Sequence, residues 1–297
     1  MRRLTKNIVA ETEFQWANVG AVITDEGIVM IDCPVRPTDS RKWQKELRSL
    51  SPLGIRYLIS TDYHGDHSTG SAYIEGVTYI APQLAYEEMA RIKEKRAISK
   101  VQDTSRDTYV KTLQEQGFKE EAEEIAEAVV PLPKICFDET LILHFPPLTF
   151  QIRRLGAHSP ACSAVYIPEE KVIFTSDNVI DSPCPGLRDA SVDVWLSALE
   201  WIDSLPVDSI VPGHGEIGGK EVIGRLRNFL SGIRETMEKQ VKAGKTKAEA
   251  IGDSSFERFF WADVSRGSYW VRNRRDTFQR GLARVYDDLK GKQGNWK

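Results

Sequence analysis

Four side chains able to bind a metal ion lie within six consecutive positions. The segment Thr61–His67 contains Asp62, His64, Asp66 and His67. Carboxylate oxygens and imidazole nitrogens are donors that zinc and non-haem iron accept. Gly65 in the same segment frees the backbone to turn, so that neighbouring side chains can converge. A polar turn in front of a helix would have a similar composition, so this cluster by itself leaves two interpretations open.

The other histidines favour the metal site. The chain has only five histidines, and four of them lie in turn-like segments. Two belong to the cluster above, His158 lies in Gly156–Pro160, and His214 lies in Pro212–Gly215. His144 instead lies within a strand pattern, where a structural role is expected. Histidines that converge with carboxylates are typical of a shared metal centre.

The elements that must position these residues are short strands. Chain reversals at strand ends are where α/β folds gather their sites. In four places an acidic residue or a histidine ends or closely follows a β-rich run, which predicts convergence on one rim of the fold. These residues are Asp32 after the run from Ile28, Asp62 after Ile55–Ser60, Asp177 after Lys171–Thr175, and His214 after Val207–Val211.

The remaining pattern is one of strands and helices, twice over. Apolar runs predict further strands at Val19–Thr24, Val77–Ile80, Glu139–His144, Leu148–Leu155 and Cys162–Ile167. Apolar residues at helical spacing predict helices at Ser40–Leu50 and Asp193–Leu205. A charged helical insert is expected over about 84–130 and a helical C-terminal extension over about 220–297. Because no Pro-, Gly- or Ser-rich linker interrupts the chain, residues 1–297 are predicted to form a single α+β or α/β domain.

Composition narrows the class of protein. The chain is 41% hydrophobic and 28% charged, with a net charge of −3, which is typical of a globular protein and provides no basic excess for nucleic acid. No apolar run approaches the roughly 20 residues that span a bilayer, so no membrane partner is expected. The four cysteines lack a CxxC spacing, and no apolar stretch follows the basic residues at the N-terminus. These features predict reduced thiols and a cytoplasmic location.

Taken together, the motifs resemble those of the metallo-β-lactamase superfamily. The resemblance covers roughly residues 15–220 and includes five motifs in the family's order: Asp32, then Asp62-x-His64-x-Asp66-His67, then His158, Asp177 and His214. It implies a four-layer αββα sandwich with a metal site at one edge. The chain departs from the family in one ligand, because Asp62 stands where the family usually has the first histidine.

The resemblance implies two adjacent metal sites. One would use Asp62, His64 and His158, and the other Asp66, His67 and His214. Asp177 would bridge them, and Asp32 would hold the loop of the second motif by hydrogen bonds from behind the ligands. One or two zinc ions fit this set. Three carboxylates beside four imidazoles also make a harder donor set than the usual one, which favours iron or manganese.

The expected activity is that of a metallo-hydrolase, most similar to glyoxalase II-like members. A metal-bound hydroxide would attack a small-molecule ester, thioester, lactone or amide, and Asp66 would orient the nucleophile or move its proton. Three alternatives stay open: a mononuclear iron dioxygenase of the persulfide-oxidising type, a phosphodiesterase or nuclease, and a catalytically weakened metal-binding scaffold. The insert is expected to form a lid or a homodimer surface. Cys184, on a Pro-rich loop expected to border the site, could face the substrate or be a small buried residue.

Overall fold

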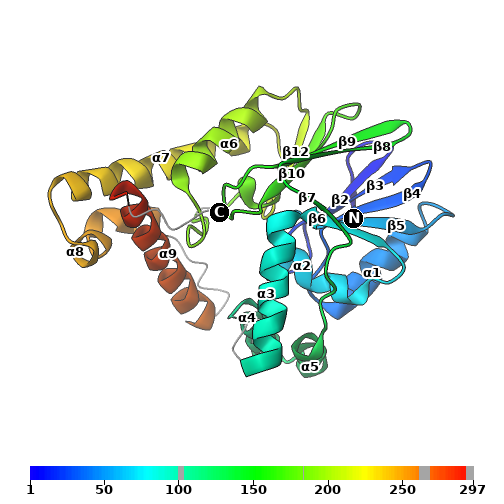
Figure 1. Cartoon of the computed structure of the whole chain (residues 1–297), viewed down its shortest axis with the longest axis horizontal. Helices are drawn as coiled ribbons and strands as arrows, with labels where there is room; N and C mark the ends of the chain where they lie inside the picture. Colours follow the sequence, from blue (N-terminus) through cyan, green and yellow to red (C-terminus); the bar gives the residue numbers. More distant parts are fainter. Residues whose placement is uncertain (100–103, 183, 261–267, 292–297) are drawn as a thin grey trace.

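Two β-sheets pack against each other through a shared apolar cluster, in the right half of Figure 1. The computed structural model describes residues 1–99, 104–182, 184–260 and 268–291. One sheet has the strand order β1-β2-β3-β4-β5-β6-β7 and the other β12-β11-β10-β9-β8. The strands are β1 (Arg2–Arg3), β2 (Ile8–Glu11), β3 (Val19–Thr24), β4 (Gly27–Ile31), β5 (Ile55–Ile59), β6 (Thr78–Pro82), β7 (Ile135–Phe137), β8 (Thr140–Phe145), β9 (Leu148–Arg154), β10 (Ser163–Ile167), β11 (Val172–Phe174) and β12 (Ser209–Val211).

Helices cover the outer faces of the two sheets. The helices are α1 (Pro37–Arg48), α2 (Gly65–Ser68), α3 (Gln83–Ser99), α4 (Thr104–Glu115), α5 (Lys119–Glu127), α6 (Val192–Ser204), α7 (Glu221–Lys242), α8 (Lys247–Ile251) and α9 (Ser268–Leu289), with 3-10 turns η1 (Thr69–Tyr73), η2 (Ser176–Asn178) and η3 (Ser254–Phe259). Helix α1 packs Trp43 and Leu47 against the outer face of the first sheet. Helices α6 and α7 pack Trp195 and Leu230 on the outer face of the second. The predicted four-layer αββα sandwich is confirmed.

Strand β4 shows why the sheets stack in this way. Successive side chains of a strand point to opposite faces. Ile28 and Met30 therefore belong to the cluster under α1, while Val29 and Ile31 belong to the cluster between the sheets. All four side chains are at most 2% exposed. The continuous apolar run of this strand is thus explained by burial on both faces.

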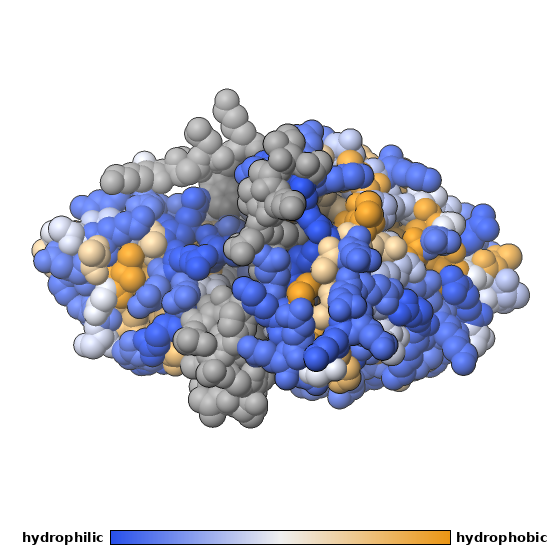
Figure 2. All heavy atoms as spheres, turned by 90° about the horizontal axis from the view of Figure 1, so that it is seen from below, coloured by the Kyte–Doolittle hydropathy of each residue, from blue (hydrophilic) through white to orange (hydrophobic). Residues whose placement is uncertain are grey.

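The segment between β6 and β7 and the C-terminal segment are helical, as the sequence predicts. The first contains α3, α4 and α5, and Gly117 ends α4 with a left-handed backbone (φ +87). The insert lies on the face seen from below, where hydrophilic residues predominate and hydrophobic residues form small separate groups (Figure 2). In the described part of the chain, no helix combines the length and apolar character needed to cross a membrane.

The strand prediction missed β1, β2 and β7. Strand β2 lies between two charged stretches, and its pairing with β3 joins Ile8 to Val22 and Glu11 to Val19. Strand β7 is only three residues long and completes the sheet beside β6. These short strands form because they pair with a neighbouring strand of the sheet. The local amino-acid sequence does not reveal that pairing.

Candidate metal centre

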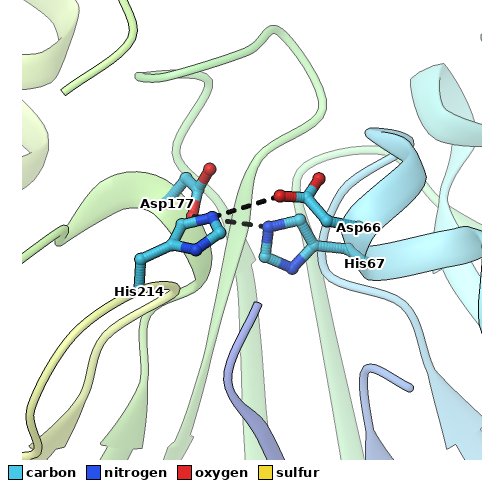
Figure 3. A group of neighbouring side chains, drawn as sticks. All are labelled: Asp66, His67, Asp177 and His214. Carbon is cyan, nitrogen blue, oxygen red and sulfur yellow. Dashed lines mark ion pairs between the residues drawn. The ribbon is translucent and has the colours of Figure 1, made fainter. Parts of the chain in front are cut away.

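Four side chains from three separate chain segments meet at one edge of the sandwich (Figure 3). Asp66 and His67 come from α2, Asp177 from η2 after β11, and His214 from the turn after β12. His214 Nε2 lies 3.2 Å from Asp66 Oδ2 and 3.3 Å from Asp177 Oδ1. His67 Nε2 lies 3.4 Å from the same Asp177 oxygen. We call these four residues the Asp66 group.

Three more side chains form a second group beside the first. The Asp62 group contains Asp62, His64 and His158, whose donor atoms lie within 4.8 Å of one another. Asp62 Oδ2 lies 3.2 Å from His64 Nδ1. Asp177 contacts both groups, because its other oxygen, Oδ2, lies 3.3 Å from His158 Nε2. The structure thus brings together all seven residues that the sequence singled out as ligands, in the two sets implied by the family resemblance.

The donor atoms are suited to hold metal ions. Two ligands bound at about 2.0–2.1 Å on a tetrahedral zinc ion are about 3.3 Å apart, close to the separations seen here. Four buried donor atoms have no hydrogen-bond partner among the described residues, although buried polar atoms are normally paired. They are Asp62 Oδ2, His67 Nε2, His158 Nδ1 and Asp177 Oδ1. A bound metal ion would give a partner to Asp62 Oδ2, His67 Nε2 and Asp177 Oδ1, which face other donor atoms of the two groups.

Charge coupling in the site favours ionised carboxylates. Burial raises the pKa of Asp66, but the hydrogen bond from His214 and the charge of His67 outweigh burial and hold it below its ordinary value. Burial likewise opposes the charge on His214, yet Asp177 and Asp66 raise the pKa of His214 to about 10. Burial lowers the pKa of His158, and the nearby Asp177 carboxylate does not outweigh that effect. Without metal, His214 therefore carries a proton at neutral pH and His158 does not.

Asp32 holds the Asp66 group from behind, in the position that the family resemblance implies. Its Oδ2 accepts from Thr61 Oγ1 (2.6 Å) and lies 2.9 Å from His67 Nδ1, and its Oδ1 accepts from Thr61 N (2.8 Å). Asp32 has a left-handed backbone (φ 56), which Asp tolerates better than most residues. The contact through Nδ1 leaves His67 Nε2 directed at Asp177, away from Asp32.

Trp16 supports the same group, and sequence reasoning missed it. Its carbonyl oxygen lies 3.1 Å from His214 Nδ1, so the Nε2 atom is left for the site. The backbone of Trp16 is left-handed (φ 80), which is strained for a bulky side chain. Its ring packs edge-on against Tyr109 of α4 at 4.8 Å. A main-chain carbonyl has no sequence signature, so only the structure could reveal this contact.

Asp189 and Ser159 support the Asp62 group, and both were missed. Asp189 Oδ2 lies 3.2 Å from His64 Nε2 and accepts from Arg188 Nε at 2.9 Å. Ser159 Oγ donates to Asp62 Oδ1 at 2.7 Å, and the Tyr63 amide donates to the same oxygen. Burial opposes the charge on His64, but the carboxylates of Asp62 and Asp189 outweigh burial and raise the pKa of His64 to about 10.

Two other residues singled out from the sequence lie outside the centre. Cys184 is only 2% exposed and packs in the cluster with Leu187 and Trp195, so the interpretation as a small buried residue is the correct one. His144 lies exposed on β8, outside both groups.

Close packing fixes the shared carboxylate. A Cβ atom on Gly213 would lie 2.0 Å from Asp177 Oδ1, so only glycine fits beside this carboxylate. The side chain of Asn18 donates to the carbonyls of Pro212 and Gly215 at 2.9 and 2.8 Å and so holds the His214 turn from both sides.

A cleft of about 1000 Å³ leads to the two groups. Its walls include Trp16, Tyr109 of the insert and Arg274 of α9, and its floor includes Asp66 and His158. This volume lies at the upper end of the range for small-molecule sites, about 300–1,000 Å³. The insert therefore forms part of the wall beside the candidate metal centre.

Comparison with known proteins identifies the family. The sequence model of the metallo-beta-lactamase superfamily matches residues 17–214, so the chain belongs to this superfamily, whose members are mostly metal-dependent hydrolases. A linear primary-alkylsulfatase from Pseudomonas sp. is 21% identical over 263 residues, which cover 76% of this chain and 47% of that protein. A metallo-beta-lactamase type 2 from Bacteroides fragilis is 25% identical over 138 residues, covering 43% of this chain and 55% of the relative. The chain thus spans about half the length of these curated relatives.

Solved structures show the same fold. A metallo-beta-lactamase from Pontibacter korlensis superposes with a TM-score of 0.59 at 16% identity, covering 77% of this chain and 97% of that one. The metallo-beta-lactamase IND-7 gives a TM-score of 0.59 at 15% identity and covers 78% and 96% of the two chains. At these identities the likeness concerns the fold.

Proposed function

We propose that this protein is a metal-dependent hydrolase of a small carbonyl substrate: an ester, thioester, lactone or amide. The observation that carries the proposal is the convergence of seven donor residues on one cleft, in two groups that share Asp177. A divalent ion, zinc in first place and one or two per chain, would supply a Lewis acid and lower the pKa of a bound water from about 15.7 toward 7.

The chain's own residues would then position and move protons. Asp66 lines the cleft, and its low pKa keeps it an acceptor at neutral pH. A carboxylate in this place can orient a water molecule and accept its proton. His67 and His214 are held through their Nδ1 atoms by Asp32 and Trp16, so their Nε2 atoms face the centre.

A second candidate is an iron-dependent dioxygenase, favoured by one observation. Asp62 gives the centre a carboxylate where the family usually has an imidazole, and hard oxygen donors shift preference toward iron. Metal content separates the two candidates. Zinc with hydrolysis supports the first, whereas a single iron that consumes oxygen supports the second.

The test starts from protein purified without added metal. Elemental analysis is followed by a panel of esters, thioesters and lactones. Asp66→Ala should abolish hydrolysis and remove most of the metal while the protein stays folded by circular dichroism. His144→Ala is the matched control, since it removes an exposed histidine outside the centre. An Asp66→Ala protein with full activity and full metal content would contradict the proposal.

A further inference from the structure

A second cavity, of about 460 Å³, opens between the helical insert and the candidate metal centre. Its walls come from α3, from Arg106 of α4, from the last residue of α5 and the three that follow it (127–130), and from Arg188 and Asp189. We call it the insert cavity. Its volume suits a small organic molecule.

The walls of the insert cavity carry an excess of positive charge. They contain three acidic residues, Glu88, Glu127 and Asp189, and six basic residues: Arg91, Lys93, Lys95, Arg96, Arg106 and Arg188. This contrasts with the whole chain, in which 43 acidic residues outnumber 40 basic ones. A cavity lined by one sign of charge concentrates ligands of the opposite sign.

Two of the three acidic residues are already matched. Glu88 Oε2 accepts from Arg91 Nε at 2.8 Å, and Asp189 Oδ2 accepts from Arg188 Nε at 2.9 Å. These two contacts involve Arg91 and Arg188, which are two of the six basic residues in the lining. Arg106 is only 5% exposed and donates to the carbonyl of Ala128 at 2.7 Å, so one of these cations is built into the wall.

Apolar side chains lie among these cations. Met89 and Ile92 come from α3, and Val129 and Val130 from the segment after α5. Val129 is 72% exposed, so its apolar surface is accessible to a ligand. Cations interleaved with apolar side chains suit a ligand that has both an anionic group and an apolar stretch.

The insert cavity adjoins the cleft of the metal centre. His64, Arg188 and Asp189 line both spaces. These three side chains therefore lie at the boundary of the two spaces, and a ligand that passes them would have one part at the metal centre and another in the insert cavity.

We propose that the insert cavity binds the anionic end of an amphiphilic organic anion, with a carboxylate, sulfate or phosphate separated by an apolar stretch from the bond at the metal centre. That this anion is a substrate rests on the proposed hydrolase function. That the cavity binds it does not, so binding and turnover are tested separately.

Binding is measured with the full chain and a matched pair of fluorescent probes, anilinonaphthalene sulfonate and its uncharged parent phenylnaphthylamine. The variant Lys93→Gln/Lys95→Gln removes two exposed lysines of α3 that line the cavity. It should weaken sulfonate binding about fivefold and leave the neutral probe unchanged. The control Lys239→Gln/Lys242→Gln removes two exposed lysines of α7 outside the cavity and should match wild type. Equal sulfonate affinity in all three proteins would overturn the proposal.

Displacement of the sulfonate probe then identifies the anionic group. Octanoate, octyl sulfate and octyl phosphate have the same apolar chain, so their relative potencies rank the three head groups. Octanol is the uncharged control and should displace the probe at least tenfold less well. Equal displacement by octanol would show that the apolar lining alone binds the ligand and would contradict the proposal.

Turnover is compared for aryl esters that end in a free carboxylate or in its methyl ester. The α3 variant should raise KM about fivefold for the anionic ester alone, with kcat unchanged, because the lysines act on binding and not on the reacting bond. If neither ester is hydrolysed by wild type, the proposed hydrolase function fails, while the probe measurements still decide whether the cavity binds anions.

Discussion

The two halves of the candidate metal centre are supported in different ways. In the Asp66 group, His67 contacts Asp32 and His214 contacts the main-chain carbonyl of Trp16. In the Asp62 group, His64 contacts Asp189, a partly exposed carboxylate on a loop, and the Nδ1 atom of His158 has no hydrogen-bond partner in the described chain.

This difference concerns how firmly each half is held before a metal ion arrives. Asp32 is 3% exposed and anchored to Thr61, so it cannot move without disturbing the end of β5. The Asp189 side chain is 31% exposed and shares its carboxylate with Arg188. Preorganised ligands bind with less loss of freedom. We therefore expect the Asp66 group to bind metal more tightly than the Asp62 group.

The largest loss of activity is expected from a substitution that displaces a ligand shared by the Asp66 group and the Asp62 group. Gly213→Ala places a methyl group 2.0 Å from Asp177 Oδ1 and must displace the carboxylate that both groups share. A misplacement of about 1 Å can cost about 100-fold in rate, so activity should fall at least that far, with metal lost from both groups. Metal content and kcat/KM are measured together.

Gly224→Ala is the matched control for this steric test. Gly224 lies in α7, and its added Cβ would meet nothing within 4 Å. Alanine is favoured over glycine within a helix by about 1 kcal/mol, so this variant should keep its metal and be slightly more stable. Loss of metal from the Gly224 variant as well would show that the Gly213 effect is not local.

The next largest effect separates the two halves. Asp62→Ala should empty the Asp62 group and leave the Asp66 group filled, because its Oδ2 atom is a donor to that group only. Asp62→His should raise the occupancy of the Asp62 group and shift its preference toward zinc, since imidazole is a softer donor than carboxylate. Metal per chain, by element, is compared for wild type and both variants under one metal supply. Identical metal content in all three proteins would show that Asp62 is not a ligand of the centre.

Substitution of the supporting carboxylates should give smaller, unequal effects. Asn has one acceptor oxygen, whereas Asp32 accepts two hydrogen bonds from Thr61 and contacts His67 as well. Loss of such supporting contacts typically costs about 10–100-fold in metal affinity. Asp32→Asn should weaken the Asp66 group by about 100-fold, and Asp189→Asn should weaken the Asp62 group by only about tenfold. Competition with a coloured chelator measures both affinities, and a larger effect at Asp189 would reverse the comparison.

The smallest effect is a difference in protons released on metal binding. His67 and His214 of the Asp66 group both have a raised pKa in the metal-free protein, whereas in the Asp62 group the pKa of His64 is raised and that of His158 is lowered. Each protonated histidine must lose its proton to bind metal, so affinity falls as pH falls. At neutral pH, filling the Asp66 group should release about two protons and filling the Asp62 group about one.

Calorimetry in buffers of different ionisation enthalpy measures this release. The Asp62→Ala variant reports on the Asp66 group alone, and the difference from wild type gives the other group. Equal proton release from both groups would contradict the expectation that His64, His67 and His214 are protonated in the metal-free protein and His158 is not.

The sequence predicted most strands because their side chains are buried on at least one face. Strands β3, β4, β5 and β10 were placed to within one residue at each end. Strand β2 was missed because its four residues show no local strand pattern, and their extended conformation depends on pairing with β3. The four layers followed from the family resemblance, since element order alone left α/β and α+β open.

The sequence also predicted which side chains converge, but not what holds them. Histidine and aspartate in loops after strands are visible in the sequence. Asp189 contacts His64 from 125 positions away, and the Trp16 contact with His214 uses a carbonyl that every residue has. A contact between Ser159 and the centre could have been predicted, because Ser159 directly follows the candidate ligand His158. The other two contacts depend on tertiary structure.

Trp16 joins two parts of the molecule that are far apart in sequence. Its carbonyl orients His214, and its ring packs on Tyr109 of the insert, both through one strained residue. When one of these contacts orders Trp16, the other contact forms with a smaller loss of conformational freedom. Such coupling is reciprocal, so each contact stabilises the other. Occupation of the Asp66 group should therefore slow amide hydrogen exchange in α4, and an insert closed over a ligand should slow dissociation of the metal. The insert would then act as a sensor of whether the centre is loaded, as well as a wall of the cleft.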